Sequence, residues 1–170
     1  MNYAEALSAG QSRALTTAIM KHVGDDKKRF NVLCKLVFGK DTLLQQRAVW
    51  PFSEIILSHH NWMAGHWQAC SDLLKNESLH EAVHRNMLRC LQVVPIPEQY
   101  QTEILDTCLK AIMSERRAVA VRAFSITVAA EICKTQAELK RELRLILEEL
   151  AQQPMTAALQ VRVKRALKAL

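Results

Sequence analysis

One short pattern returns at a nearly constant interval along this chain. It consists of an Arg, a small residue and a large apolar residue, and its copies begin at Arg47, Arg85, Arg122 and Arg165, which are 38, 37 and 43 residues apart. A period near 40 is typical of stacked helix pairs, because one pair cannot bury its own apolar face and must pack on its neighbours. The period therefore predicts an array of helix pairs.

The composition supports an all-α fold. The chain has 170 residues, which suits one domain over residues 1–170. Only 4 Gly and 4 Pro are present, too few for the many tight turns of a β-sandwich or barrel. Hydrophobic residues at 49% and charged residues at 24% are ordinary for a globular protein.

Turn-forming residues and apolar spacing divide the chain into helices. They predict an N-terminal cap over residues 1–24, with its helical stretch at about 2–23, and four helix pairs over residues 25–170. The repeated pattern falls in the second helix of every pair. The predicted pairs are 26–38/41–58, 62–74/78–94, 97–113/115–133 and 136–152/156–170.

Local signals predict where some of these helices begin and bend. Ser78 with Glu81, and Thr135 with Glu138, have the spacing of capping boxes. Pro51 lies inside a predicted helix and is expected to kink it.

Several stretches resemble those of the HEAT-like (armadillo-type) α-solenoid family, in particular its small bacterial members, over about residues 26–170. They are Lys-His-Val-Gly-Asp-Asp (21–26), Gln-Arg-Ala-Val-Trp (46–50), His-Arg-Asn-Met-Leu-Arg (84–89) and Val-Ala-Val-Arg-Ala-Phe (118–124). The resemblance implies a right-handed α-α superhelix of about four pairs after a cap. It also implies a non-catalytic module that displays a curved helical surface to a protein partner.

The same resemblance implies a ladder in which an Asp early in the second helix pairs with an Arg six residues later. Asp41 and Arg47 match this ladder, whereas Leu79, Arg116 and Leu159 replace the Asp in the other repeats. In the last repeat Val161-Arg162 also fits the family pattern, so two registers stay open there. The repeat arginines are candidates either for partner contact or for tying neighbouring helices together, and for Arg47 we favour the second role.

The net charge of +6 is concentrated at the ends of the chain, with +3 over residues 1–58, −1 over 59–133 and +4 over 134–170. A basic end favours an acidic partner surface. An alternative is nucleic acid, because the basic helices resemble those of helical-repeat DNA glycosylases. A third interpretation is a solvated face, since four Glu are interleaved at i,i+4 spacing. The candidate contact residues are Arg141, Arg144, Arg162, Lys164, Arg165 and Lys168.

A remote alternative is a zinc-dependent hydrolase. His80-Glu81-Ala82-Val83-His84 matches the His-Glu-x-x-His pattern, which on a helix places two imidazoles one turn apart beside a carboxylate. Glu103 has the spacing of a third ligand in one class of aminopeptidase. The capping box gives Glu81 a structural explanation, however, and no strand for a peptidase domain is readable. We therefore predict no metal, no cofactor and no enzymatic activity.

The remaining aromatic and metal-ligating residues favour structural roles. His59, His60 and His66 could take up a metal adventitiously, but surface and helix-end positions are the commoner interpretation. Trp50, Trp62 and Trp67 are expected mainly in the core, with one exposed Trp as an alternative contact point.

The chain reads as a cytoplasmic protein. The N-terminus lacks the basic start and apolar run of a secretory signal, and no uncharged run suits a membrane span. The five Cys lie 18 to 36 residues apart without a Cys-x-x-Cys, as expected for buried thiols in a reducing compartment.

Overall fold

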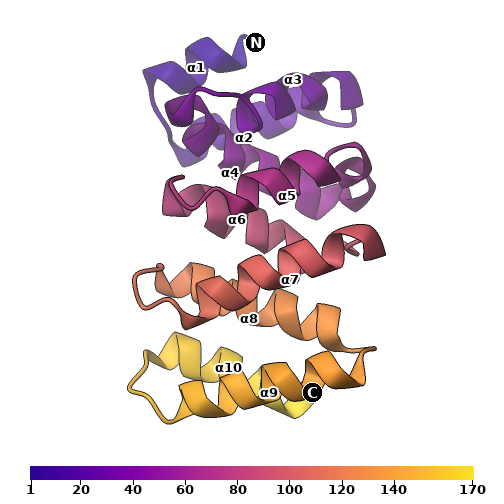
Figure 1. The fold of residues 1–170 in the computed structure, drawn as a ribbon. Helices are drawn as coiled ribbons and strands as arrows, with labels where there is room; N and C mark the ends of the chain where they lie inside the picture. The colour runs from indigo at the N-terminus through magenta and orange to yellow at the C-terminus, as the bar shows by residue number, and fades with distance from the viewer. The chain divides into compact units, whose positions relative to one another are not determined.

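The computed structural model describes residues 1–170 and contains helices joined by loops, with no strand (Figure 1). Its ten α-helices and one 3₁₀ helix form two compact units, unit 1 (Met1–Val94) and unit 2 (Pro95–Leu170). Unit 1 contains α1 (Tyr3–Ala9), α2 (Arg13–Val23), α3 (Lys27–Val37), α4 (Thr42–Ser58), the 3₁₀ helix η1 (His60–Gly65), α5 (Trp67–Lys75) and α6 (Glu81–Leu91). Unit 2 contains α7 (Glu98–Met113), α8 (Val119–Cys133), α9 (Ala137–Ala151) and α10 (Ala157–Ala169). The predicted all-α fold is confirmed.

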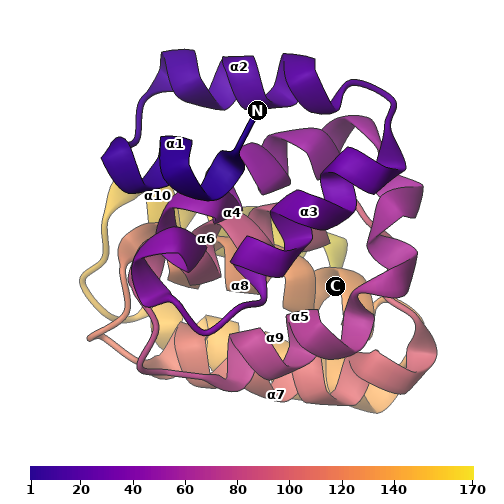
Figure 2. The ribbon, with the colours of Figure 1, turned by 90° about the horizontal axis from the view of Figure 1, so that it is seen from above.

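Unit 1 is organised around α4. This helix packs against α1, α2, α3, η1 and α6. In Figure 2 the first three of these lie nearest the viewer, with α4 behind them. The core is aromatic, since the ring of Phe30 stacks on Phe52 at 5.4 Å and contacts Trp62 at 5.1 Å between centroids.

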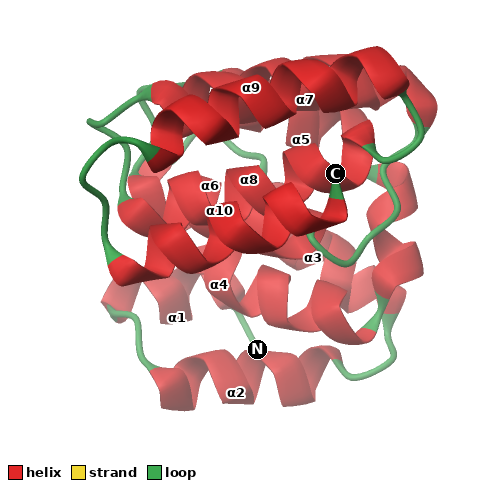
Figure 3. Ribbon diagram, turned by 90° about the horizontal axis from the view of Figure 1, so that it is seen from below, coloured by secondary structure: helices red, strands yellow, loops and turns green.

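Unit 2 is organised around α8, which packs against α7, α9 and α10. Figure 3 shows α7 and α9 in one layer, with α8 and α10 in the other. Nine of the fifteen residues of α8 are buried, including the whole run Val128–Ala130. A helix that is apolar on nearly every side must be buried against several neighbouring helices. For α8 these neighbours are α7, α9 and α10.

The predicted cap is itself a pair of short helices, α1 and α2. Asn2 caps the first and Ser12 the second, each by accepting a hydrogen bond from a backbone N–H three residues on. The predicted single helix over 62–74 is also divided, because η1 ends at Gly65 and α5 begins only at Trp67. Glycine has low helix propensity, which is consistent with a break at that point.

Both predicted capping boxes are wrong. The N-cap of α6 is His80, whose Nδ1 accepts a hydrogen bond from the Ala82 N–H at 3.1 Å, while the Ser78 hydroxyl donates to Asn76. The N-cap of α9 is Gln136, with no side-chain hydrogen bond, so Thr135 lies one residue outside the capping position. Pro51 lies inside α4, which continues past it to Ser58.

Candidate interaction surface

Two repeat arginines join the second helix of a pair to the C-terminal end of another helix. Arg47 in α4 donates from Nη1 to the carbonyls of Leu7 at 2.7 Å and Ser8 at 2.9 Å, in the last turn of α1. Arg122 in α8 donates from Nε to the Ile112 carbonyl at 3.0 Å, in the last turn of α7. The last carbonyls of a helix have no intrahelical partner and carry partial negative charge, so a guanidinium is well placed there.

Asp41 does not reach Arg47 as the ladder implied. Its carboxylate caps α4, accepting hydrogen bonds from the backbone N–H groups of Leu43 at 3.0 Å and Leu44 at 2.9 Å. The Asp therefore fixes the beginning of the helix, and the Arg fixes its packing against α1.

Two of the six predicted contact residues are half-buried and form hydrogen bonds to other helices of unit 2. Arg162 donates to the Thr127 hydroxyl at 3.0 Å, and its guanidinium lies 5.6 Å from the ring centroid of Phe124. Arg144 donates to the Leu167 carbonyl at 3.4 Å, in the last turn of α10. These contacts join α10 to α8 and to α9. They also place Arg162, rather than the exposed Arg165, in the tying role in the last repeat.

The other four predicted contact residues are exposed. Arg141 lies on α9, and Lys164, Arg165 and Lys168 lie on α10. No Asp or Glu occurs in α10. Beside these cations Val161 is 46% exposed. The outer face of α10 thus combines three cationic groups with an accessible apolar group.

A small pocket adjoins this face at the turn between α9 and α10. Its volume is about 180 Å³, and Lys164 contributes to its wall. The other lining residues are Ala151, Met155, Gln160 and Val163. A pocket of this size suits one apolar side chain of a partner, with a cation at its edge.

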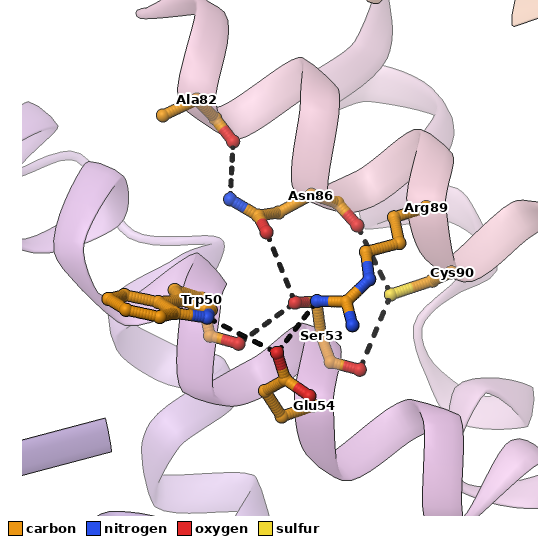
Figure 4. Close-up of polar contacts among 7 residues, drawn as sticks. All are labelled: Trp50, Ser53, Glu54, Ala82, Asn86, Arg89 and Cys90. Atoms are coloured by element: carbon orange, nitrogen blue, oxygen red, sulfur yellow. Dashed lines mark hydrogen bonds and ion pairs between the residues drawn. The ribbon is translucent and has the colours of Figure 1, made fainter. Parts of the chain in front are cut away.

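A polar cluster missed by the sequence analysis joins α4 to α6 in unit 1 (Figure 4). The buried Asn86 donates to the Ala82 carbonyl at 2.8 Å, and its Oδ1 lies 3.2 Å from the hydroxyl of buried Ser53. That hydroxyl also lies 2.9 Å from the Trp50 carbonyl and can donate to either acceptor. The signal was present in the repeats, since Asn86 stands where the other copies have Ala48, Ala123 and Ala166.

An ion pair lies at the edge of the same cluster. Glu54 accepts hydrogen bonds from Arg89 at 2.7 Å and from the indole of Trp50 at 3.2 Å. The hydrogen bond from Arg89 holds the pKa of the Glu54 carboxyl below its ordinary value, against the opposing effect of burial. The cluster is a polar interface between two helices, and its side chains form hydrogen bonds with one another.

The tryptophans are largely in the core. Trp62 is 8% exposed and Trp67 is 7% exposed, whereas Trp50 is half-buried. The exposed Trp considered as a contact point is therefore not present in the structure.

The His-Glu-x-x-His motif does not lie on one helical face. His80 is the exposed N-cap of α6 with non-helical backbone angles, and its Nδ1 accepts the Ala82 N–H. His84 is inside the helix and 2% exposed, and Glu103 is an exposed residue of α7. No group of three or more His, Cys, Asp or Glu is arranged to hold a metal ion. The geometry required by the hydrolase alternative is therefore not formed.

The other histidines of this region have separate local partners. His59 lies 3.0 Å from Asp25 and stacks on Trp62, and the Nε2 of His60 lies 3.1 Å from the Leu57 carbonyl. His66 stacks on Phe38, and burial lowers its pKa. These imidazole rings therefore make local contacts at helix ends and with aromatic side chains at the edge of the core.

None of the five cysteines forms a disulfide, and all are buried. Burial raises the pKa of Cys34, Cys90 and Cys108 to about 12 and that of Cys133 to about 11. A thiol with a raised pKa is a weak nucleophile at neutral pH, so these groups have a packing role.

The paired helices, their buried small residues and the arginines that tie them together define an α-helical repeat protein. The family model of the HEAT repeat domain matches residues 3–170, and the chain belongs to this family. The match includes α1 and α2, so the family extends further toward the N-terminus than the expected residue 26. No curated protein and no solved structure matches the chain. No helix is both long enough and apolar enough to cross a membrane.

Proposed function

We propose that this protein is a non-catalytic interaction module of the cytoplasm, and that it binds an acidic protein surface with the outer face of α10. HEAT repeats are generally protein-interaction scaffolds, so a protein partner follows from the family. The composition of the outer face of α10 supports the proposal that the partner surface is acidic. Lys164, Arg165 and Lys168 are exposed on a helix that contains no acid.

The apolar features of the face favour a protein over a purely electrostatic contact. Val161 is exposed among the cations, and the pocket at the α9–α10 turn has Ala151, Met155 and Val163 in its lining with Lys164. Interfaces draw most of their affinity from a few residues buried in well-packed pockets, while charges steer association and fix the register. A partner segment with one apolar side chain between acidic residues would satisfy both features.

The absence of a catalytic role is supported by the state of the reactive groups. The thiols for which burial raises the pKa are poor nucleophiles, and the His80 and His84 side chains differ in exposure and backbone setting. We propose that no cofactor is needed. Elemental analysis of the purified protein should accordingly find no stoichiometric zinc.

Charge reversal tests the proposed face. We expect Lys164→Glu, Arg165→Glu and Lys168→Glu, combined in the full chain, to reduce recovery of the specific protein partner about 10-fold in affinity capture. The matched control reverses three exposed cations of unit 1, Lys28, Lys35 and Lys40, and should leave recovery unchanged. Equal loss in both variants would contradict the proposal.

Nucleic acid is the second candidate, because the same acid-free helix could contact phosphates. It predicts a gel shift with duplex or single-stranded DNA at low salt that weakens steeply as salt is raised. It also predicts capture that is abolished by nuclease. Nuclease-resistant capture without a gel shift would favour the protein partner.

A further inference from the structure

A second pocket in unit 2 has an acidic residue as its one charged lining group, whereas α10 contains only basic charged residues. It lies between the C-terminal parts of α7 and α9 and has a volume of about 210 Å³. It is lined by Ile112, Met113, Ile146, Glu149, Leu150 and Gln153. Pockets that bind small molecules usually have volumes of about 300–1,000 Å³. The size therefore suits a single long side chain rather than a cofactor.

The lining divides into an apolar part and an acidic part. Ile112 is fully buried and Leu150 nearly so, whereas Met113 is 60% exposed at the rim. Methionine is flexible and polarisable, and it adapts well to different partner side chains. The one charged group of the lining is the carboxylate of Glu149, on an exposed residue.

Glu149 stands where a helix is least suited to a negative charge. It lies in the last turn of α9 beside Glu148, and this turn contains no basic residue. The C-terminal end of a helix carries partial negative charge and favours cations, so two carboxylates there are locally unfavourable. Glu148 is compensated by Arg144 at 3.7 Å, in an i,i+4 pair. Local rules are most often broken at functional positions.

The end of α7 does not share this imbalance. Arg122 donates to the Ile112 carbonyl at 3.0 Å, and Lys110 pairs with Asp106 at 2.8 Å. The negative charge at this pocket is therefore the Glu149 carboxylate, which stands beside the C-terminal end of α9.

We infer that this pocket is a docking site for one arginine side chain from a protein partner. The aliphatic stem of an arginine would pack on Met113, Ile146 and the accessible edge of Leu150, as long cationic side chains do along apolar surfaces. The planar guanidinium would form paired hydrogen bonds with the Glu149 carboxylate. The inference does not depend on the α10 face, because the lining and the sign of the charge are different.

The test uses two short peptides, acetyl-Gly-Leu-Arg-Leu-Gly-amide and the same peptide with citrulline in place of Arg. Citrulline keeps the shape and removes the charge. NMR of methyl-labelled Met and Ile in the full chain reports the site, and Met113→Leu assigns the Met113 signal. We expect the Arg peptide to shift the Met113 methyl, and the citrulline peptide to bind at least about 10-fold more weakly.

A matched pair of variants tests whether binding of the Arg peptide depends on the Glu149 carboxylate. Glu149→Gln should weaken the Arg peptide about 10-fold, while Glu148→Gln, the neighbour paired with Arg144, should change its affinity less than about twofold. Glu149→Gln should also raise the midpoint of thermal unfolding, because a charge is removed from the C-terminal end of a helix. Lost binding in this variant would then not reflect unfolding.

Three results would overturn the inference. They are no Met113 shift with the Arg peptide, equal binding of the citrulline peptide, and equal weakening by the Glu148 and Glu149 variants. The α10 charge-reversal variant should bind the Arg peptide normally, so that failure of this site and failure of the α10 face can be told apart.

Discussion

The four residues that follow the repeat arginines share a structural role that the arginines themselves do not. Ala48, Asn86, Ala123 and Ala166 are all buried in the second helix of their pair, where a small side chain lets another helix approach. The preceding arginines differ in their contacts. Arg47 donates a hydrogen bond that joins α4 to α1, whereas Arg85 and Arg165 are exposed. The period could be read from sequence because burial of a small residue imposes it. The hydrogen-bond partner of each arginine could not be read from sequence, because it depends on which backbone carbonyl lies within reach of the guanidinium.

The tie made by Arg47 predicts a local loss of stability. Arg47→Gln removes charged hydrogen bonds to the Leu7 and Ser8 carbonyls and should cost about 1–3 kcal/mol. Urea unfolding gives this free energy, and hydrogen exchange should show loosening of residues 3–9. Arg85→Gln, at the exposed equivalent in α6, should stay within about 0.5 kcal/mol of wild type. Similar costs for both would mean that the tie is not stabilising.

The Asn86 cluster predicts coupling between two helices. Asn86→Ala restores the residue of the other repeats but removes the side-chain hydrogen bonds to the Ala82 carbonyl and the Ser53 hydroxyl, so we expect a loss of about 0.5–1.5 kcal/mol. A double-mutant cycle with Ser53→Ala, measured by urea unfolding, should give a coupling energy of at least about 0.5 kcal/mol. Additive losses would show that the two side chains do not interact.

The buried thiols predict how stability changes with pH. Their pKa in the folded protein, about 12 for Cys34, Cys90 and Cys108, is above the ordinary value of 9.0. The unfolded chain therefore ionises first, and the stability contributed by the neutral thiols is present below pH 9 and is lost as pH rises from there. Unfolding midpoints measured from pH 7 to 11 should fall above pH 9. A Cys108→Ala variant should fall less steeply, and an equal slope would contradict this origin.

At the scale of the element, the sequence predicts most helices but not all of their beginnings. Apolar spacing located α3, α4, α7, α9 and α10 to within a residue or two at their N-termini, because burial of one face sets that spacing. Caps were harder to predict. Several polar side chains near a helix start can accept the first N–H groups, and in α6 the backbone turn at Asn76 engages Ser78 and leaves His80 to cap the helix.

A pair of threonines tests the observed caps. Thr156 caps α10, accepting the Leu159 N–H at 3.4 Å, so Thr156→Ala should cost about 0.5–1 kcal/mol. Thr135, which the capping-box pattern placed at the start of α9, makes no such bond. Thr135→Ala should therefore be neutral within about 0.5 kcal/mol in thermal or urea unfolding. A larger loss of stability for Thr135→Ala than for Thr156→Ala would contradict the observed caps and support the predicted capping box.

The orientation of α10 decides which basic residues are available. Two registers fitted its sequence, one centred on Arg162 and one on Arg165. The structure turns Arg162 inward onto Thr127 and Phe124 and leaves Lys164, Arg165 and Lys168 outside. A rotation of this kind is set by packing on α8, which sequence spacing alone does not fix. The pockets beside α9 could not be predicted either, because they depend on how neighbouring helices end.

At the scale of the whole molecule, a net charge of +6 does not imply a uniformly basic surface. Within unit 2, α10 presents cations without acids, whereas the pocket between α7 and α9 has Glu149 as its charged group. Two surfaces of opposite sign suit a module that binds more than one chemical type of partner segment. This division agrees with a scaffold role and explains why the total charge alone identifies no partner.

The most direct test of the central proposal is hydrogen exchange of the full chain, alone and in complex with the captured protein partner. We predict slower exchange of amides in residues 157–169 in the complex, with the effect lost after charge reversal at Lys164, Arg165 and Lys168. Protection confined to unit 1, with α10 exchanging as in the free protein, would contradict it.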